Sequence, residues 1–333
     1  MAAVLPFGNE VLEEAIAPRL SLIEERLRDA VAQSDRLADE TSRHLVDAGG
    51  KRLRPMLALL AAQLGDASRP EVIDAAVVVE LTHLATLYHD DVMDSAPTRR
   101  GAPSAHEVWG NSVAILTGDL LFARASNVVA GLGPTAVRIQ AETFERLCLG
   151  QLHETVGPGP GEDPVRHYLQ VLADKTGSLI ATSARFGAMF AGCDRTVVDQ
   201  VTAYGEYAGV AFQLADDVLD IRSNGDVSGK TPGTDLREGV ATMPVLLLRR
   251  LVDSGEAEQS DIELLADIES DLSDDAALDS VVARLREHDV LAQTSDLARQ
   301  WSARAVGAIS RLPAGDVKDA LVAFADALVA RAA

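Results

Sequence analysis

Two aspartate clusters of one spacing stand out in this sequence: Asp90-Asp91-Val92-Met93-Asp94 and Asp216-Asp217-Val218-Leu219-Asp220. In each, the first and last aspartates are four residues apart, which places their carboxylates on one face of a helix. Like charges at that spacing repel, and the C-terminal end of a helix is partially negative, so such a cluster needs a cation. Carboxylate oxygens without cysteine or well-placed histidine select Mg²⁺ rather than Zn²⁺, and Mg²⁺ usually binds substrate phosphate as well.

A solvated acidic patch is the alternative interpretation for either cluster alone, because the chain has 51 acidic residues. Two clusters of the same pattern, each at the end of a very apolar helix, argue against a mere patch. The sequence therefore predicts a magnesium site that binds a diphosphate substrate.

Basic residues occur in two places that could bind the remaining charge of a diphosphate. The segment Gly49-Gly50-Lys51-Arg52-Leu53-Arg54-Pro55 places three cations on a turn before a helix, and Arg99-Arg100-Gly101 follows the first aspartate cluster. Glycine lets backbone amides approach phosphate, and arginine binds phosphate with two parallel hydrogen bonds. Ordinary surface charge is the alternative for each, but it is less expected in a strongly acidic chain beside a metal motif.

Two histidines and one lysine are weaker candidates. His83 lies seven residues before Asp90 on the same helical face, and a core histidine bonded to a carbonyl is an equally good interpretation. His89 faces away from Asp90, so we expect a structural role. The segment Gly225–Thr231 resembles a phosphate-binding P-loop, but Pro232 follows it and no strand precedes it, so we interpret Lys230 as a loop cation that closes over the diphosphate.

These residues lie on elements that the hydrophobic pattern predicts to be helices. Apolar residues recur every three or four positions, with almost no strand-like alternation, and two helices near Val72–Asp94 and Ala203–Ile221 are apolar on most faces. Helices of that kind lie in the centre of a bundle. Arg222–Gly239 is predicted to be a long functional loop. Without an extended linker, we expect an all-α fold with a single domain over residues 1–333.

Composition limits the class of protein. The chain is 47% hydrophobic and only 4% aromatic, which favours helices, and its formal net charge of −21 argues against binding nucleic acid. The two cysteines, Cys148 and Cys193, are too few for a disulfide framework or zinc cluster. The N-terminus lacks the basic start of a signal peptide, and no apolar run reaches the length of a membrane span. We therefore expect a soluble, cytoplasmic protein without a transmembrane segment.

The motifs resemble those of one family, the trans-isoprenyl diphosphate synthases or polyprenyl synthetases. Six of them occur in family order: GGKRLRP, HDDVMD with PTRRG, GDLLFARA, DKTGSLI, FQLADDVLD and GKTPGTDLREG. The resemblance runs from about Val11 to the C-terminal helices. It implies an all-α bundle around a deep central cavity, the isoprenoid synthase fold, and usually a homodimer.

The resemblance also implies a reaction and residue roles. A Mg²⁺-dependent prenyltransferase of this family, which transfers alkyl groups other than methyl, condenses isopentenyl diphosphate with an allylic diphosphate to an all-trans polyprenyl diphosphate. The implied residues are Lys51, Arg54, His83 and Arg100 for isopentenyl diphosphate; Arg99, Lys175, Thr176 and Gln213 for the allylic diphosphate; Asp90, Asp94, Asp216 and Asp220 for Mg²⁺, with Asp217 as a further or water-mediated ligand; and Lys230 as the loop lysine. Many members carry a second loop lysine where this chain has Thr234, so loop closure is expected to be weaker.

Product length is predicted from the residues one turn before Asp90. Short-chain members often carry bulky aromatics there, whereas this chain has Ala85 and Thr86, and deeper positions on the next helix include Ser126 and Val129. We therefore predict a long-chain product, hexaprenyl to decaprenyl, which would be delivered to a membrane. Tyr88 points away from Asp90 on a regular helix. A short-chain farnesyl or geranylgeranyl diphosphate synthase is the alternative.

Three other functions compete with this interpretation. A class I terpene cyclase needs only one diphosphate site, and the two groups of basic residues argue against it. A His-Asp phosphohydrolase would need further histidine ligands, and His44, His106 and His153 show no such pattern. A non-catalytic subunit of a heteromeric synthase would be expected to lose metal ligands, and this chain keeps both clusters.

Overall fold

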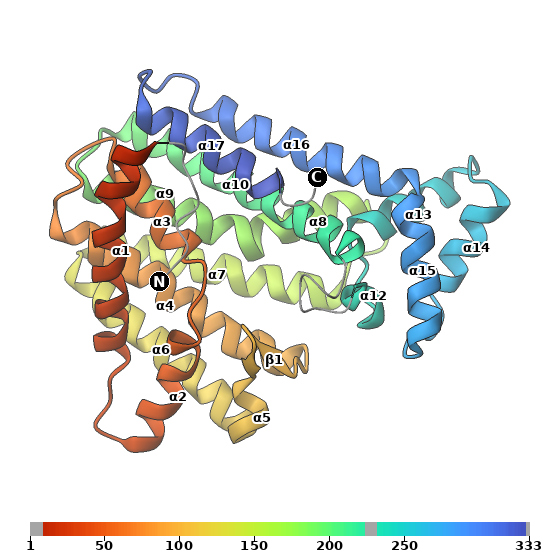
Figure 1. Ribbon diagram of the computed structural model, residues 1–333, viewed down its shortest axis with the longest axis horizontal. Helices are drawn as coiled ribbons and strands as arrows, with labels where there is room; N and C mark the ends of the chain where they lie inside the picture. The colour runs from red at the N-terminus through yellow and green to blue at the C-terminus, as the bar shows by residue number, and fades with distance from the viewer. Residues whose placement is uncertain (1–8, 224–231, 331–333) are drawn as a thin grey trace. The chain divides into compact units, whose positions relative to one another are not determined.

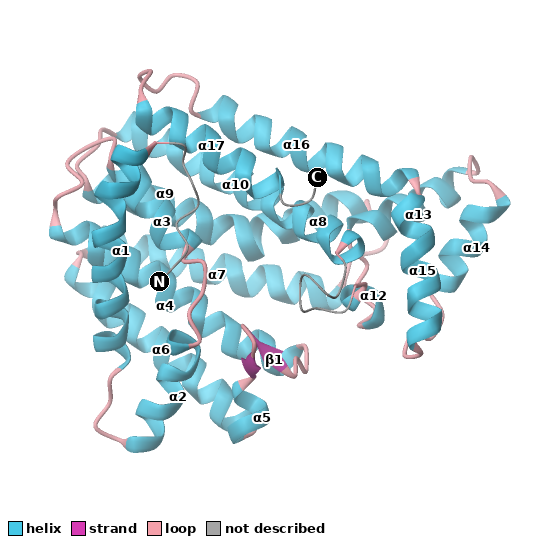
Figure 2. Cartoon of the chain, in the orientation of Figure 1, coloured by secondary structure: helices cyan, strands magenta, loops and turns pink. Residues whose placement is uncertain are grey.

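The computed structural model describes residues 9–223 and 232–330, and these are almost entirely helical, as the sequence predicted. Figure 2 shows helices in cyan throughout, with one short strand pair in magenta. The helices, labelled in Figure 1, are α1 (Glu10–Val31), α2 (Arg36–Asp47), α3 (Leu53–Ala62), α4 (Pro70–Met93), α5 (Ala105–Trp109), α6 (Asn111–Gly131), α7 (Pro134–Val156), α8 (Pro164–Leu172), the π-helical turn η1 (Ala173–Gly177), α9 (Ser178–Phe190), α10 (Arg195–Arg222), α12 (Thr234–Arg237), α13 (Met243–Ser254), α14 (Gln259–Ile268), α15 (Asp275–Glu287), α16 (Asp289–Ala308) and α17 (Asp316–Ala330).

The strand pair is a small hairpin that the sequence did not predict. Strands β1 (Thr98–Arg99) and β2 (Ala102–Pro103) pair antiparallel, with Arg99 opposite Ala102. Arg100 and Gly101 form its turn, and both have positive φ angles, of 54° and 78°. The hairpin thus sets the backbone of the two arginines that follow the first aspartate cluster.

The described chain divides into two compact units. The first comprises residues up to 147, 178–206 and 306–324. Helix α4 is its central element and packs against α1, α3, α6 and α9. Helices α3 and α9 approach each other so closely that a Cβ on Gly187 would lie 2.0 Å from the carbonyl oxygen of Ala58. The predicted burial of the first apolar helix is confirmed, since most of α4 is inaccessible to solvent.

The second unit comprises residues 148–177, 207–305 and those from 325 onward. Its core includes Val218 and Ile221 of α10 and Leu236 of α12, with apolar residues of α13, α14, α15 and α16. A second cluster joins Tyr168 and Leu172 of α8 to Leu214 of α10 and Met243 of α13. Both clusters hold the C-terminal part of α10, which carries the second aspartate cluster. The prediction of one domain over residues 1–333 stays a prediction.

Two helices correct the expectation that no apolar run reaches the length of a membrane span. By length and composition, α4 and α6 could both cross a membrane. In α4, 72% of the apolar window is buried inside the protein, as in the core helix of a globular fold. In α6, only 33% of the window is buried, so much of this apolar helix is uncovered within the described chain.

Candidate active site

Helix α4 directs the first aspartate cluster in two directions. Asp90 lies in its last turn and is partly buried, whereas Asp94 is the exposed C-cap residue, whose N–H donates to the carbonyl oxygen of Asp90 at 2.8 Å. Asp91 is fully buried, because a residue one position along a helix is rotated by about 100°. Asp90 and Asp94 are therefore more accessible than Asp91, and their role as Mg²⁺ ligands stays a prediction.

The buried carboxylate of Asp91 binds an arginine of the hairpin. Nε of Arg99 donates to Oδ1 of Asp91 at 2.6 Å, and Nη2 of Arg99 lies 2.5 Å from the same oxygen. Burial raises the pKa of Asp91, and the charge of Arg99 opposes that rise. The cation that the sequence required for this aspartate is thus supplied by the protein. Because Arg99 stays partly exposed, its remaining N–H groups can still face a diphosphate.

The first unit also gathers a group of cations. Arg54, in the first turn of α3, has a buried Nε with no hydrogen-bond partner among the described residues. Its pKa is lowered to about 10, first by burial and also by repulsion from Arg100. His83 has a pKa held well below its usual range by burial and then by Arg54 and Arg100, so the imidazole is neutral at pH 7. Such mutually repelling cations would be stabilised by a bound anion.

Helix α10 divides the second cluster in the same way. Asp216 and Asp220 are partly exposed, whereas Asp217 is 2% exposed. The hydroxyl of Tyr168 lies 3.1 and 3.0 Å from the two carboxylate oxygens of Asp217, and the N–H of Met243 donates to one of them at 3.2 Å. Asp217 thus joins α8 and α13 to α10. The expectation that Asp217 is a further or water-mediated metal ligand stays a prediction.

Lys175 and Thr176 lie in the π-helical turn η1, whose geometry is frequent at functional sites. The hydroxyl of Thr176 donates to Oε1 of Gln213 at 3.2 Å, so two residues predicted for the allylic diphosphate are brought together. The ammonium of Lys175 forms an ion pair with Glu154 of α7. Sequence reasoning missed Glu154, because nothing around it in the sequence singles it out.

The described end of the predicted loop, from residue 232 onward, contacts the second aspartate cluster. Lys230 lies outside the described residues. Beyond it, the N–H of Gly233 donates to the carbonyl oxygen of Asp220 at 2.9 Å, and the N–H of Asp235 lies 3.4 Å from Oδ2 of Asp220. Thr234, at the position of the family's second lysine, is the first residue of α12. Asp235 is therefore a further acidic residue beside the cluster, one that the sequence analysis did not single out.

The residues predicted for product length divide by exposure. Ala85 and Val129 are fully buried, and Thr86 and Ser126 are partly exposed. The expected orientation of Tyr88 is confirmed, since its hydroxyl donates to the carbonyl of Thr41 at 2.5 Å, in α2.

His89 has the structural role expected of it. Its Nε2 lies 3.1 Å from the carbonyl oxygen of Ile115, and the ring packs against Gly118 of α6.

Comparison with known proteins decides the family. The sequence model described as Polyprenyl synthetase matches residues 35–284. The chain belongs to the polyprenyl synthetase family. This synthase is 42% identical to a nonaprenyl diphosphate synthase of Mycobacterium tuberculosis, over 99% of this chain and 98% of the relative. It is therefore a prenyltransferase of the family that joins isopentenyl diphosphate to allylic diphosphates.

Solved structures support the fold and a divalent cation. A polyprenyl synthase from Caulobacter crescentus matches with a TM-score of 0.87 and 32% identity, covering 97% of each chain. A geranylgeranyl pyrophosphate synthase from Corynebacterium glutamicum matches with a TM-score of 0.86 and 42% identity, covering 98% of this chain and 99% of that one. Both are described as complexed with calcium and isoprenyl diphosphate. The isoprenoid synthase fold is thus confirmed.

The donor atoms of this synthase fit a hard cation that is shared with substrate. In residues 9–223 and 232–330, no three acidic, histidine or cysteine side chains form a complete metal cage. Each cluster instead has two residues that are at least partly exposed, Asp90 with Asp94 and Asp216 with Asp220. One or two carboxylates completed by water and phosphate oxygens is the usual coordination of Mg²⁺.

Proposed function

We propose that this synthase uses Mg²⁺ to condense isopentenyl diphosphate with an allylic diphosphate, giving an all-trans polyprenyl diphosphate of hexaprenyl to decaprenyl length. The proposal rests mainly on one observation, the closeness of the cationic side chains Arg54 and Arg100 in the first unit. Arg54 and Arg100 repel each other, and Nε of Arg54 has no partner within the described chain. A second diphosphate site of this kind has no use in a terpene cyclase.

The allylic substrate is proposed to bind with its diphosphate, the leaving group of the reaction, beside the metal ions and a set of cationic and polar side chains. Arg99, Lys175, Thr176 and Gln213 hold it, with Lys230 closing over it. When bound, Mg²⁺ at Asp90, Asp94, Asp216 and Asp220 would act as a Lewis acid on the departing diphosphate. The Lys175–Glu154 pair and the Thr176–Gln213 hydrogen bond support this assignment, because they hold three of these side chains in fixed positions before substrate arrives.

Isopentenyl diphosphate is proposed to bind Lys51, Arg54, His83 and Arg100. Its double bond then attacks the allylic cation, and proximity of the two substrates contributes much of the rate. Neutral His83 can donate a hydrogen bond to a phosphate oxygen without adding to the repulsion between the arginines. We assign the final proton to the released diphosphate, because the sequence offers no obvious general base and the family resemblance points to this route.

The long-chain product is proposed from small side chains rather than from the relatives alone. The nonaprenyl relative and the geranylgeranyl relative are both 42% identical to this chain, so identity does not separate the two lengths. Thr86 is partly exposed one turn before Asp90, and its hydroxyl donates to the carbonyl of His83 at 2.8 Å. A small residue there leaves room for a growing tail.

Substituting Thr86→Phe is expected to shorten the product, because an aromatic ring would block the tail one turn below the aspartates. Products would be sized by chromatography after dephosphorylation. Thr86→Ser is the matched control and should keep the wild-type length. An unchanged product in Thr86→Phe would contradict the proposed path of the tail.

One assay tests the proposed function as a whole. Purified protein would be incubated with Mg²⁺, labelled isopentenyl diphosphate and a panel of allylic primers, and the products sized. A product of about 30 carbons or more, which corresponds to at least about six five-carbon units, supports the proposal. Absence of elongation with every primer would refute it, and products of 15 or 20 carbons, about three or four units, would favour the short-chain alternative.

The proposal extends to the working form of the protein. We infer that residues 1–333 form a single catalytic domain in a cytoplasmic homodimer, whose product passes to a membrane. Exposed apolar side chains on α6, among them Ile115 and Leu116, support a second copy as partner.

A further inference from the structure

A buried carboxylate lies among three arginines of the first unit, Arg52, Arg54 and Arg100. Glu80 of α4 is 1% exposed. Its Oε1 accepts a hydrogen bond from Nη1 of Arg52 at 2.8 Å and lies 4.0 Å from Nη2 of Arg100. Its charge also acts on Arg54. The negative charge of Glu80 thus attracts three guanidinium groups, those of Arg52, Arg54 and Arg100. Arg54 and Arg100 are assigned above to isopentenyl diphosphate.

Arg52 is oriented by the fold rather than left to face a substrate. Its side chain is 1% exposed, and it donates to Glu24 of α1, to Glu80 and to the carbonyl oxygen of Val46. Its backbone has a φ of 49°, in the sparsely populated left-handed region. A non-glycine residue keeps that conformation only when surrounding contacts enforce it. The Arg52 side chain therefore links α1 to α4 in a fixed position, through Glu24 and Glu80.

Arg100, whose Nη2 lies near Glu80, is also held by backbone carbonyl oxygens. Its Nη1 donates to the carbonyl oxygens of Leu45 and Gly49, and its backbone is also left-handed, with a φ of 54°. Its guanidinium lies so close to Gly50 that a Cβ there would be 2.9 Å from Cζ of Arg100. The Gly49-Gly50 turn, the hairpin and Glu80 together fix where this guanidinium points.

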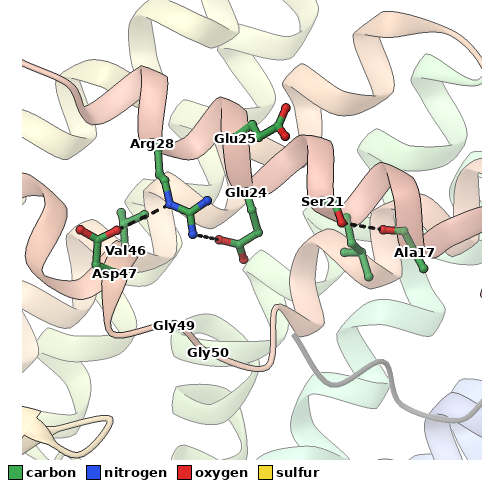
Figure 3. A pocket seen from close by; sticks show the side chains of 10 residues that line it. Ala17, Ser21, Glu24, Glu25, Arg28, Val46, Asp47, Gly49 and Gly50 are labelled. Atoms are coloured by element: carbon green, nitrogen blue, oxygen red, sulfur yellow. Dashed lines mark hydrogen bonds and ion pairs between the residues drawn. The ribbon is translucent and has the colours of Figure 1, made fainter. Parts of the chain in front are cut away.

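The two anions of this network differ in their access to solvent. Glu24 lines a cavity of about 460 Å³ with Arg28, Asp47 and the Gly49-Gly50 turn. Figure 3 shows Glu24 beside that turn, with Arg28 between Glu24 and Asp47. The Glu24 side chain is 20% exposed and that of Glu80 is 2% exposed. Water can replace part of the role of Glu24, but not that of Glu80.

We propose that Glu80 is a positioning residue for the isopentenyl diphosphate site, where its buried carboxylate orients Arg52 and Arg100 and opposes the repulsion among Arg52, Arg54 and Arg100. The inference rests on the proposed assignment of Arg54 and Arg100 to that diphosphate. Glu80 itself touches no substrate. Removing its charge would let the guanidinium groups separate, and binding of isopentenyl diphosphate would weaken while the site of the allylic substrate stays intact.

The test compares Glu80→Gln, which keeps shape and removes charge, with two other variants in the full-length protein. Glu24→Gln removes the anion that, among Arg52, Arg54 and Arg100, contacts only Arg52, and that also pairs with Arg28. Thr82→Val changes an equally buried side chain of α4, whose hydroxyl donates only to the carbonyl of Val78. For each, KM would be measured for both substrates, together with kcat and the midpoint of thermal unfolding.

We expect Glu80→Gln to raise KM for isopentenyl diphosphate by at least about tenfold, with much smaller changes in kcat and in KM for the allylic primer. Glu24→Gln should give a smaller rise of the same kind, and Thr82→Val none. An unchanged KM for isopentenyl diphosphate in Glu80→Gln, or equal rises for both substrates, would overturn the proposal.

If Glu80→Gln gives no folded protein, Glu24→Gln decides. A selective rise in KM for isopentenyl diphosphate then supports the proposal, and an unchanged KM overturns it. Failure of the proposed function would look different, because the wild-type protein itself would then elongate no primer.

Discussion

At the residue scale, each aspartate motif contains two kinds of carboxylate. Asp90, Asp94, Asp216 and Asp220 are at least partly exposed, whereas Asp91 and Asp217 are buried against Arg99 and Tyr168 respectively. The difference follows from the turn of a helix, since the middle aspartate lies about 100° from the first one. The same letter in the sequence thus serves as a candidate ligand in one position and as an internal anchor in the next.

The buried aspartate of the second motif makes a prediction about stability and pH. Burial raises the pKa of Asp217 well above the value of 3.8 that it has when unfolded. The folded state then binds more protons than the unfolded state, so the contribution of Asp217 to the free energy of unfolding falls as pH rises above about 4. Asp217→Asn removes the charge; its amide oxygen can still accept from the N–H of Met243, and its amide N–H can donate to the hydroxyl oxygen of Tyr168, so this fall should disappear.

Denaturant unfolding of Asp217→Asn and wild type at several pH values measures this. At pH 7 the variant should be at least as stable as wild type, and a loss above about 2 kcal/mol in unfolding free energy would show that the charge of Asp217 is not destabilising. Asp216→Asn is the matched variant on the exposed side of α10. It should fold normally and lose activity by on the order of a hundredfold or more.

At the element scale, the helices could be predicted and their interruptions could not. The apolar pattern placed the first central helix at about Val72–Asp94, and α4 spans Pro70–Met93. That pattern is local and strong. The π-helical turn at Ala173–Gly177 and the hairpin at 98–103 depend on contacts with other elements, which spacing along the chain does not show.

The close approach of α7 to the π-helical turn leads to a prediction about the allylic site. Helix α7 approaches it at Gly150, where a Cβ would lie 2.7 Å from the backbone nitrogen of Lys175. Gly150→Ala should displace the turn and with it Lys175 and Thr176. We expect a rise in KM for the allylic primer or a fall in kcat by about tenfold, and a loss of roughly 1–3 kcal/mol in unfolding free energy.

Steady-state kinetics and denaturant unfolding measure these effects. Gly131→Ala, at the end of α6, is the control, because a Cβ there meets nothing within 4 Å. Wild-type kinetics in Gly150→Ala would show that the position of the turn does not govern the allylic site.

At the scale of the whole molecule, the sequence predicted the family from six motifs spread between Gly49 and Gly239, and the family match over 35–284 confirms it. It did not find Glu80, Glu154 or Asp235. Each is one of 51 acidic residues, and nothing in its sequence neighbours distinguishes a carboxylate with a partner in the fold from a solvated one. Such roles follow from partners distant in sequence, like Arg52 for Glu80 or Asp220 for Asp235.

The exposed apolar surface of α6 yields the last prediction. Leu116 is 65% and Ile115 is 42% exposed on a helix whose apolar window is only 33% buried. Apolar surface of this extent is stabilised by a partner. Leu116→Glu should therefore weaken the proposed homodimer by about a hundredfold or more, because a charge would be buried in the interface. Sedimentation velocity would show a dimer for wild type and for Ile262→Glu, a control on α14 where Ile262 is 44% exposed. A wild-type monomer that instead sediments with lipid vesicles would identify a membrane surface, rather than a second copy, as the partner of α6.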